Sequence, residues 1–152
     1  MACRSLVSSS TSIKIGLLSC PSLYDTMKVA NPNSEIYLFE FDERFSVYDN
    51  FVHYDYNRAT EIDYLVEYKQ FFDIIIADPP FLAEECIEKL SKIIQNISKS
   101  EAKVILCSGQ TVCEWAKKYL NLNKCQFQPE HERNLGNEFA AYANFDMDKL
   151  IQ

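Results

Sequence analysis

The chain has 152 residues, of which 47% are hydrophobic, so it can bury one substantial core but is too short for two ordinary domains. Its formal net charge of −7 argues against a protein that binds by neutralising many phosphates, because that interaction needs clustered Lys and Arg. No apolar run approaches the roughly 20 residues that cross a bilayer, and the six cysteines have no CxxC spacing, so we expect a cytoplasmic protein with reduced cysteines and no membrane partner.

Apolar runs that stop at polar or proline-containing turns alternate with segments of helical spacing along most of the chain. The expected strands are residues 13–18, 36–39, 51–54, 72–77 and 103–107, and the expected helices begin near Pro21 or cover residues 60–69, 86–97 and 112–120. The helix over 60–69 is predicted from Thr60 and Asp63, which are spaced as a variant of the capping box. Residues 125–145 are expected to form two further strands around a polar connection.

This alternation predicts an α/β fold, a Rossmann-like and mostly parallel sheet of about seven strands with helices on both faces. The last two strands are expected to form an antiparallel hairpin at one edge. In such a sheet, ligands bind outside the carboxyl ends of the strands, where the strand order reverses. The loops that follow the strands are therefore the candidates for a functional site. Four of them have unusual content: residues 19–22, 40–42, 55–57 and 78–81.

The tetrapeptide Asp78-Pro79-Pro80-Phe81 is the most informative of these loops. Its two prolines fix φ near −65° and have no N–H, so the neighbouring carbonyls are free to accept hydrogen bonds from a ligand. Asp78 adds a carboxylate acceptor and Phe81 adds a flat apolar face. Such a site can hold an amine through its N–H groups while directing the lone pair elsewhere. The alternative is that Asp-Pro-Pro only ends a strand.

The tetrapeptide matches, position by position, the [Asp/Asn/Ser]-Pro-Pro-[Tyr/Phe] motif that follows the fourth strand of class I S-adenosylmethionine-dependent methyltransferases. The chain resembles most closely the eukaryotic elongation factor 1-alpha lysine methyltransferase family, formerly described as putative N6-adenine-specific DNA methyltransferases. This resemblance covers nearly the whole chain from Ile13 on. Three stretches carry it: Ser19-Cys20-Pro21-Ser22-Leu23-Tyr24, Ala77-Asp78-Pro79-Pro80-Phe81-Leu82 with Glu84-Glu85-Cys86, and Arg133-Asn134-Leu135 with Asn137-Glu138-Phe139.

The resemblance implies that S-adenosylmethionine is the cofactor. The loop Ser19-Cys20-Pro21-Ser22 replaces the usual glycine-rich loop, a substitution that the named family shares. Glu40 is placed to hydrogen-bond the two ribose hydroxyls, as an acid does in dinucleotide-binding folds, and Asp42 is the second candidate. Asp55 resembles the acid that accepts from the adenine amino group, and Tyr56 offers an apolar face. The alternative is that all three acids are ordinary solvated residues at strand ends.

The resemblance also implies a substrate and a domain organisation. His131, Arg133 and Asn134 are weak candidates for substrate contacts, although this polar cluster could equally be a hydrogen-bonded turn. Family members have a longer N-terminal region, so residues 1–12 are expected to be a disordered or truncated segment before a methyltransferase domain over 13–152. No His/Cys cluster has metal-ligand spacing, and we expect no metal.

The expected activity is methyl transfer to a protein lysine, with eukaryotic elongation factor 1-alpha as the expected protein substrate and no stable nucleic-acid binding. Asp78 and the Pro79 carbonyl would orient the amine rather than act as a strong base. Two alternatives stay open. An N6-adenine methyltransferase acting on DNA or RNA could use the same tetrapeptide, but adenine would have to be flipped out of its stack and held in a basic groove. A non-catalytic methyltransferase-like subunit would have less reason to keep the tetrapeptide intact.

Overall fold

The computed structural model describes residues 12–80, 83–126 and 139–150. In this part of the chain, seven strands form one sheet in the order β3-β2-β1-β4-β5-β7-β6. The first five strands are parallel, and β7 is antiparallel to both β5 and β6. The strands are β1 (Lys14–Leu18), β2 (Glu35–Glu40), β3 (Phe51–His53), β4 (Phe72–Ala77), β5 (Ser98–Gly109), β6 (Asn123–Lys124) and β7 (Phe139–Ala143). The predicted Rossmann-like sheet and its C-terminal hairpin are confirmed.

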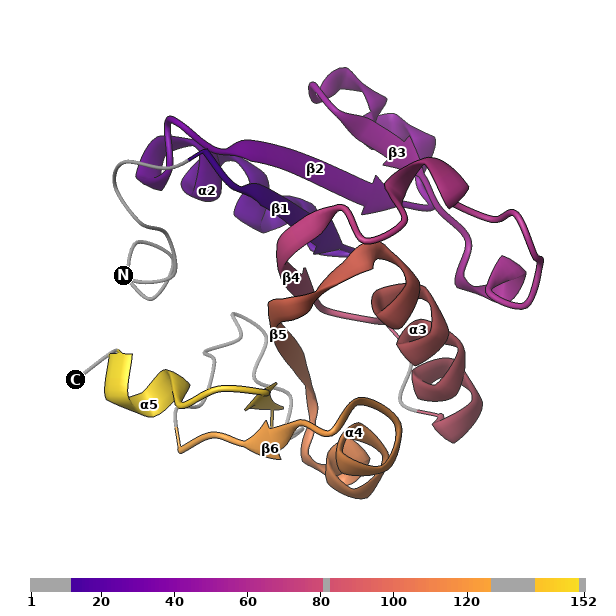
Figure 1. Cartoon of the computed structure of the whole chain (residues 1–152), viewed down its shortest axis with the longest axis vertical. Coiled ribbons are helices and arrows are strands. Elements are labelled where there is room, and N and C mark those ends of the chain that lie inside the picture. Colours follow the sequence, from indigo (N-terminus) through magenta and orange to yellow (C-terminus); the bar gives the residue numbers. More distant parts are fainter. Residues whose placement is uncertain (1–11, 81–82, 127–138, 151–152) are drawn as a thin grey trace.

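Helices cover both faces of the sheet (Figure 1). They are α2 (Tyr24–Ala30), α3 (Glu84–Ile97), α4 (Cys113–Leu120) and α5 (Met147–Leu150). Residues of α3 and α4 pack in one hydrophobic core, whereas residues of α2 and α5 pack in the core on the opposite face. None of the helices in the described ranges is both long and apolar enough to cross a membrane.

The strands form where apolar, β-branched side chains can be buried on both faces. In β4, five of the six residues are buried, among them Ile74, Ile75 and Ile76. The structure extends the predicted strand over 103–107 to twelve residues, but the register of its pairing with β4 shifts between Phe72 and Ile74. The regular part of this pairing runs from Ile74↔Lys103 to Ala77↔Leu106, which is the part that the sequence predicted.

The predicted helix over residues 60–69 is wrong. This segment consists of turns and a short 3-10 helix, Val66–Tyr68, held by backbone hydrogen bonds that span three residues. Leu65 adopts φ 58°, in the left-handed region, which interrupts any α-helix. Its neighbours Tyr64 and Tyr68 pack against the core beside α3 and β4. Tertiary burial of these aromatic side chains therefore outweighs the local capping signal, because a helix of ten residues is only marginally stable by itself.

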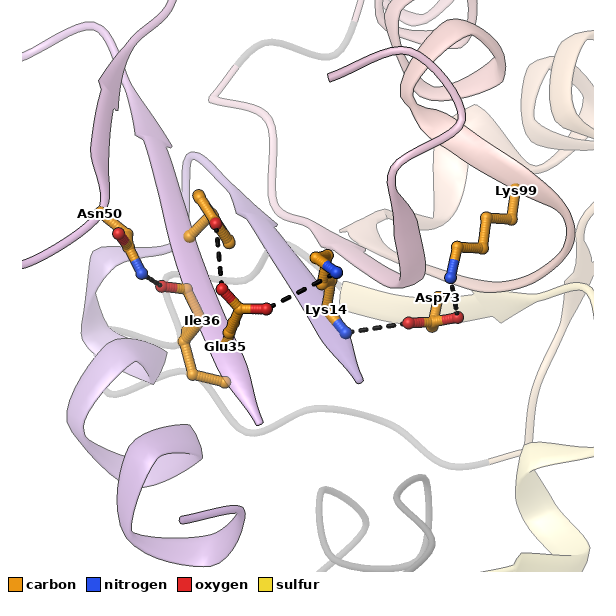
Figure 2. A network of polar contacts seen from close by, with 7 residues as sticks. Lys14, Glu35, Ile36, Asn50, Asp73 and Lys99 are labelled. Carbon is orange, nitrogen blue, oxygen red and sulfur yellow. Dashed lines mark hydrogen bonds and ion pairs between the residues drawn. The ribbon is translucent and has the colours of Figure 1, made fainter. Parts of the chain in front are cut away.

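A polar network joins the amino ends of β1, β2, β4 and β5 (Figure 2). The Asp73 carboxylate accepts hydrogen bonds from the Lys14 backbone N–H and from the Lys99 ammonium, both at 2.9 Å. The Lys14 ammonium also lies 3.6 Å from the Glu35 carboxylate. Burial by itself would raise the pKa of Asp73, but these hydrogen bonds and the two lysine charges lower it below its ordinary value. The charged form of Asp73 therefore stabilises the fold at the edge opposite the strand exits.

We predict that Asp73→Asn lowers the free energy of unfolding by about 1–2 kcal/mol at pH 7, because a hydrogen bond to a charged acceptor is lost. The folded-state pKa of Asp73 is lowered, so its contribution is present above the unfolded pKa and is lost as pH falls through the folded pKa. Urea unfolding of both proteins at pH 7 and near pH 3 is the test. Equal differences between parent and variant at the two pH values would contradict this assignment.

Candidate functional site

The strand order reverses between β1 and β4, and the exits of these two strands are joined by backbone hydrogen bonds. The Asp78 N–H donates to the Leu18 carbonyl at 3.0 Å, and the Ser19 N–H donates to the Phe39 carbonyl at 2.9 Å. The Tyr54 N–H donates to the Glu40 carbonyl at 3.1 Å. The loops after β1, β2, β3 and β4 therefore begin side by side along one edge of the sheet. In a doubly wound sheet this is the position of the ligand site.

The loop after β1 turns sharply without a glycine. Ser19 adopts φ 61°, a left-handed conformation that glycine supplies more readily. Cys20 is buried, and its thiol donates to the Ile76 carbonyl at 3.4 Å, so the loop folds over the end of β4. Pro21 then opens a 3-10 turn, Pro21–Leu23, that leads directly into α2. The sequence predicted this loop and the helix start correctly.

Cys20 lies within electrostatic range of two of the predicted site carboxylates. Burial and then the negative charge of Asp78 raise the pKa of the Cys20 thiol well above its ordinary value, and Glu40 acts in the same direction. Cys107 on β5 contributes as well. The thiol therefore stays neutral, and Cys20, on the loop after β1, lies between the exits of β2 and β4 in the strand order. The sequence singled out these loops but not Cys107 on β5.

Glu40, the last residue of β2, and Asp42 in the loop that follows have different environments. The Glu40 carboxylate accepts from the Asp42 N–H at 2.8 Å, which holds the first turn of the loop, and the Glu40 side chain is half-buried. Asp42 instead caps the 3-10 helix Glu43–Val47, and both of its oxygens bond Arg44. These hydrogen bonds hold the pKa of the half-buried Asp42 carboxyl below its usual range. Glu40 is therefore better placed than Asp42 to bind a ligand.

The residues after β3 connect the site to α3. The Asp55 carboxylate accepts from the Asn57 N–H at 2.9 Å and so caps the 3-10 turn Tyr56–Arg58. The Tyr56 hydroxyl oxygen accepts from the Cys86 thiol at 3.4 Å. This hydrogen bond and then burial raise the pKa of Tyr56 to about 12. The half-buried Tyr56 ring thus spans the space between β3 and the first turn of α3, the helix that follows the tetrapeptide, a contact that no local sequence signal indicated.

Within the tetrapeptide, Asp78 and Pro80 are exposed and Pro79 is half-buried. Phe81 lies outside the described residues, as do the predicted substrate residues His131, Arg133 and Asn134. No group of three or more His, Cys, Asp or Glu side chains in the described ranges is placed to hold a metal ion. The described site therefore consists of carboxylates, one neutral thiol, a tyrosine ring and proline-flanked carbonyls.

Solved structures of methyltransferases have the same fold. A predicted O-methyltransferase from Agrobacterium tumefaciens superposes with a TM-score of 0.64 at 16% identity, covering 93% of this chain and 78% of that one. A TehB-like SAM-dependent methyltransferase from Corynebacterium glutamicum gives a TM-score of 0.58 at 16% identity, covering 93% of this chain and 85% of that one. The fold is thus that of the Rossmann-like methyltransferases.

A model of the family described as probable N6-adenine methyltransferase matches residues 2–147, and the chain belongs to this family. The Drosophila melanogaster "Protein-lysine N-methyltransferase CG9154" is 50% identical over 142 residues, which cover 91% of this chain and 63% of that protein. The Mus musculus "EEF1A lysine methyltransferase 1" is 41% identical over 135 residues, which cover 88% of this chain and 62% of that protein. The chain therefore spans less than two thirds of the length of these relatives. The family match and these identities confirm the resemblance that was inferred from the motifs.

Proposed function

We propose that this chain is a cytoplasmic S-adenosylmethionine-dependent protein-lysine N-methyltransferase. The observation that carries the proposal is the strand reversal, where the Asp78 N–H donates to the Leu18 carbonyl and the Tyr54 N–H donates to the Glu40 carbonyl, so that the Asp-Pro-Pro exit and the end of β2 lie along one edge of the sheet. An acceptor site and a cofactor site thereby share one edge of the sheet. The names of the relatives, which are protein-lysine methyltransferases, support the same reaction.

The described residues fit the chemical groups of this cofactor. The Glu40 carboxylate matches the two ribose hydroxyls, which are donors, and the half-buried Tyr56 ring with Asp55 matches the adenine base. The negative charges of Asp78 and Glu40 suit a cationic ligand between them. When bound, S-adenosylmethionine would supply an electrophilic methyl group on a positively charged sulfur.

Asp78 and Pro79 would hold the acceptor amine. The Asp78 carboxylate and the Pro79 carbonyl accept from its N–H groups, and this directs the nitrogen lone pair toward the site between β1 and β4. A lysine with an ordinary pKa near 10.4 is mostly charged at pH 7, and its neutral form costs roughly 4.6 kcal/mol. Asp78 favours the charged form, whereas a positive charge about 5 Å away opposes it by roughly 3 kcal/mol at an effective dielectric of about 20. We therefore assign Asp78 to orientation rather than to proton removal.

The charges around the site favour a basic protein over a nucleic acid. Four basic side chains on the segments that follow the strand exits are already in ion pairs: Arg44 with Asp42, Arg58 with Glu61, Lys89 with Glu85 and Lys118 with Glu84. Paired lysines and arginines have less charge available for phosphates, and the chain as a whole carries −7. We propose eukaryotic elongation factor 1-alpha as the substrate, in line with the printed names of the relatives.

The family description supports a second candidate reaction, methylation of adenine N6 in DNA or RNA. We predict that purified enzyme and labelled cofactor, offered equal amounts of recombinant elongation factor 1-alpha, duplex DNA, single-stranded DNA and total RNA, label only the protein. Mass spectrometry should then locate the label on a lysine.

Label on adenine with none on lysine would overturn this assignment. Label on a lysine of another protein, in a cell lysate treated with nuclease, would keep the reaction and replace only the substrate. If the chain labels no acceptor but still binds cofactor, it is a non-catalytic methyltransferase-like subunit. Glu101→Gln, a change of an exposed acid in the amino-terminal half of β5, opposite the strand exits, is the matched control and should label as the parent does.

A further inference from the structure

Strand β5 continues past the point where its partner β4 ends. The last pair between them is Ala77↔Leu106, after which β4 becomes the tetrapeptide. Beyond this point β5 is paired with β7, through Cys107↔Ala141, Ser108↔Ala140 and Gly109↔Phe139. Neighbouring parallel strands advance together, so Cys107 and Ser108 run beside the first residues of the tetrapeptide.

At its two prolines, the tetrapeptide cannot be held in place by ladder hydrogen bonds from its own N–H groups. Pro79 and Pro80 have no N–H and cannot extend the ladder with β5. Their backbone direction nevertheless decides where the Pro79 carbonyl points, and this carbonyl is one of the two groups that we assign to the acceptor amine. A donor from the neighbouring strand would fix that direction.

Ser108 has such a donor. Its side chain is 1% exposed, and its hydroxyl is one of three buried hydroxyls in the described ranges that have no hydrogen-bond partner. The other two belong to Ser34, just before β2, and Ser98, at the start of β5, both at the opposite edge of the sheet. Because side chains alternate along a strand, Ser108 lies on the same face of the sheet as Leu106, and Leu106 pairs with Ala77, two residues before Pro79. A buried hydroxyl without a partner destabilises the free protein, so its position beside the tetrapeptide calls for a functional explanation.

We propose that Ser108 is a positioning residue of the methyl-transfer site, whose hydroxyl donates to the Pro79 carbonyl once the cofactor is bound. A carbonyl oxygen has two lone pairs, so Pro79 can accept from Ser108 and from the acceptor amine together. The hydroxyl is kept without a partner in the free protein and makes its hydrogen bond in the reactive arrangement. This inference rests on the proposed function.

Ser108→Ala should lower kcat about five- to tenfold, the effect of one neutral hydrogen bond, and leave KM and the cofactor Kd within twofold. The Tm of the free variant should be unchanged or higher, because an unpaired buried hydroxyl has been removed. Ser108→Cys, nearly the same size but a poor donor, should behave like Ser108→Ala, whereas Ser108→Thr should restore kcat. Ser98→Ala removes the corresponding hydroxyl at the other end of the same strand and should leave kcat unchanged.

A crystal structure of the parent with S-adenosylhomocysteine gives a readout independent of turnover. The Ser108 Oγ and the Pro79 carbonyl oxygen should lie within about 3.2 Å of each other. A longer distance, a parental kcat in Ser108→Ala, or a large fall in Tm that Ser108→Thr does not reverse would each overturn the role of Ser108. A parent that binds cofactor but methylates nothing would refute the proposed reaction. The distance from Ser108 Oγ to the Pro79 carbonyl oxygen would still test the positioning role of Ser108. A parent that binds no cofactor would refute both.

Discussion

Asp78→Ala should reduce methyl transfer by about a thousandfold or more while the cofactor Kd stays within several-fold. The carboxylate is assigned to the acceptor amine, so its loss removes an alignment that matters in the transition state and leaves cofactor contacts in place. Turnover with elongation factor 1-alpha and calorimetric titration with S-adenosylmethionine measure the two effects separately.

Asp78→Asn separates charge from hydrogen bonding at the same position. The amide keeps an acceptor oxygen, so we expect a smaller loss of kcat than in Asp78→Ala. Glu101→Gln again serves as the control. Near-normal turnover in Asp78→Ala would refute the assignment of the tetrapeptide as an amine clamp. A loss of cofactor affinity as large as the loss of kcat would place Asp78 at the cofactor instead.

Glu40→Ala should raise the Kd for S-adenosylmethionine about 10- to 100-fold, which corresponds to about 1.4–2.8 kcal/mol. The physical reason is the loss of hydrogen bonds from two ribose hydroxyls to a charged acceptor. The same change also removes the 2.8 Å hydrogen bond from the Asp42 N–H, which holds the loop after β2. Glu40→Gln keeps an acceptor oxygen for that N–H and should give an intermediate Kd.

Glu35→Gln is the matched control for Glu40. Glu35 stands at the other end of the same strand, where its carboxylate lies 3.6 Å from the Lys14 ammonium and far from the strand exits. The Kd of the Glu35→Gln variant for S-adenosylmethionine should equal the Kd of the parent. If Glu40→Ala binds S-adenosylmethionine as tightly as the parent does in calorimetric titration, the assignment of Glu40 to the ribose is refuted. Asp42 would not take over this role, because its carboxylate is bound to Arg44.

The mostly parallel sheet with its C-terminal hairpin, and the loops at its strand exits, could be predicted from local patterns. Residues 72–77 form a strand with the predicted bounds because a β-branched run is stable only where both faces are buried. Asp78-Pro79-Pro80 ends it, since a proline pair cannot continue the ladder. The helices that follow residues 83 and 112 were recognised because their apolar residues recur at helical spacing.

The prediction over residues 60–69 shows what local patterns omit. A capping signal acts over four residues, whereas Tyr64 and Tyr68 pack against a core that includes α3, which is remote in the sequence. The left-handed Leu65 is tolerated because its side chain is buried with them. In the structure, this stretch therefore covers the core beside the site and does not form an α-helix.

The amino-acid sequence by itself determined the parallel sheet, the position of the Asp-Pro-Pro exit and the strand-end acids, because periodicity, proline and charge act over short distances. Only the tertiary structure decided how these groups are used. It bound the Cys20 thiol to the Ile76 carbonyl, bound Asp42 to Arg44, joined Tyr56 to Cys86, and left the hydroxyl of Ser108 buried without a hydrogen-bond partner. Each of these relations depends on burial or on contact between separate strands, helices and loops in the folded chain. Residue spacing predicts neither the burial nor the contacts.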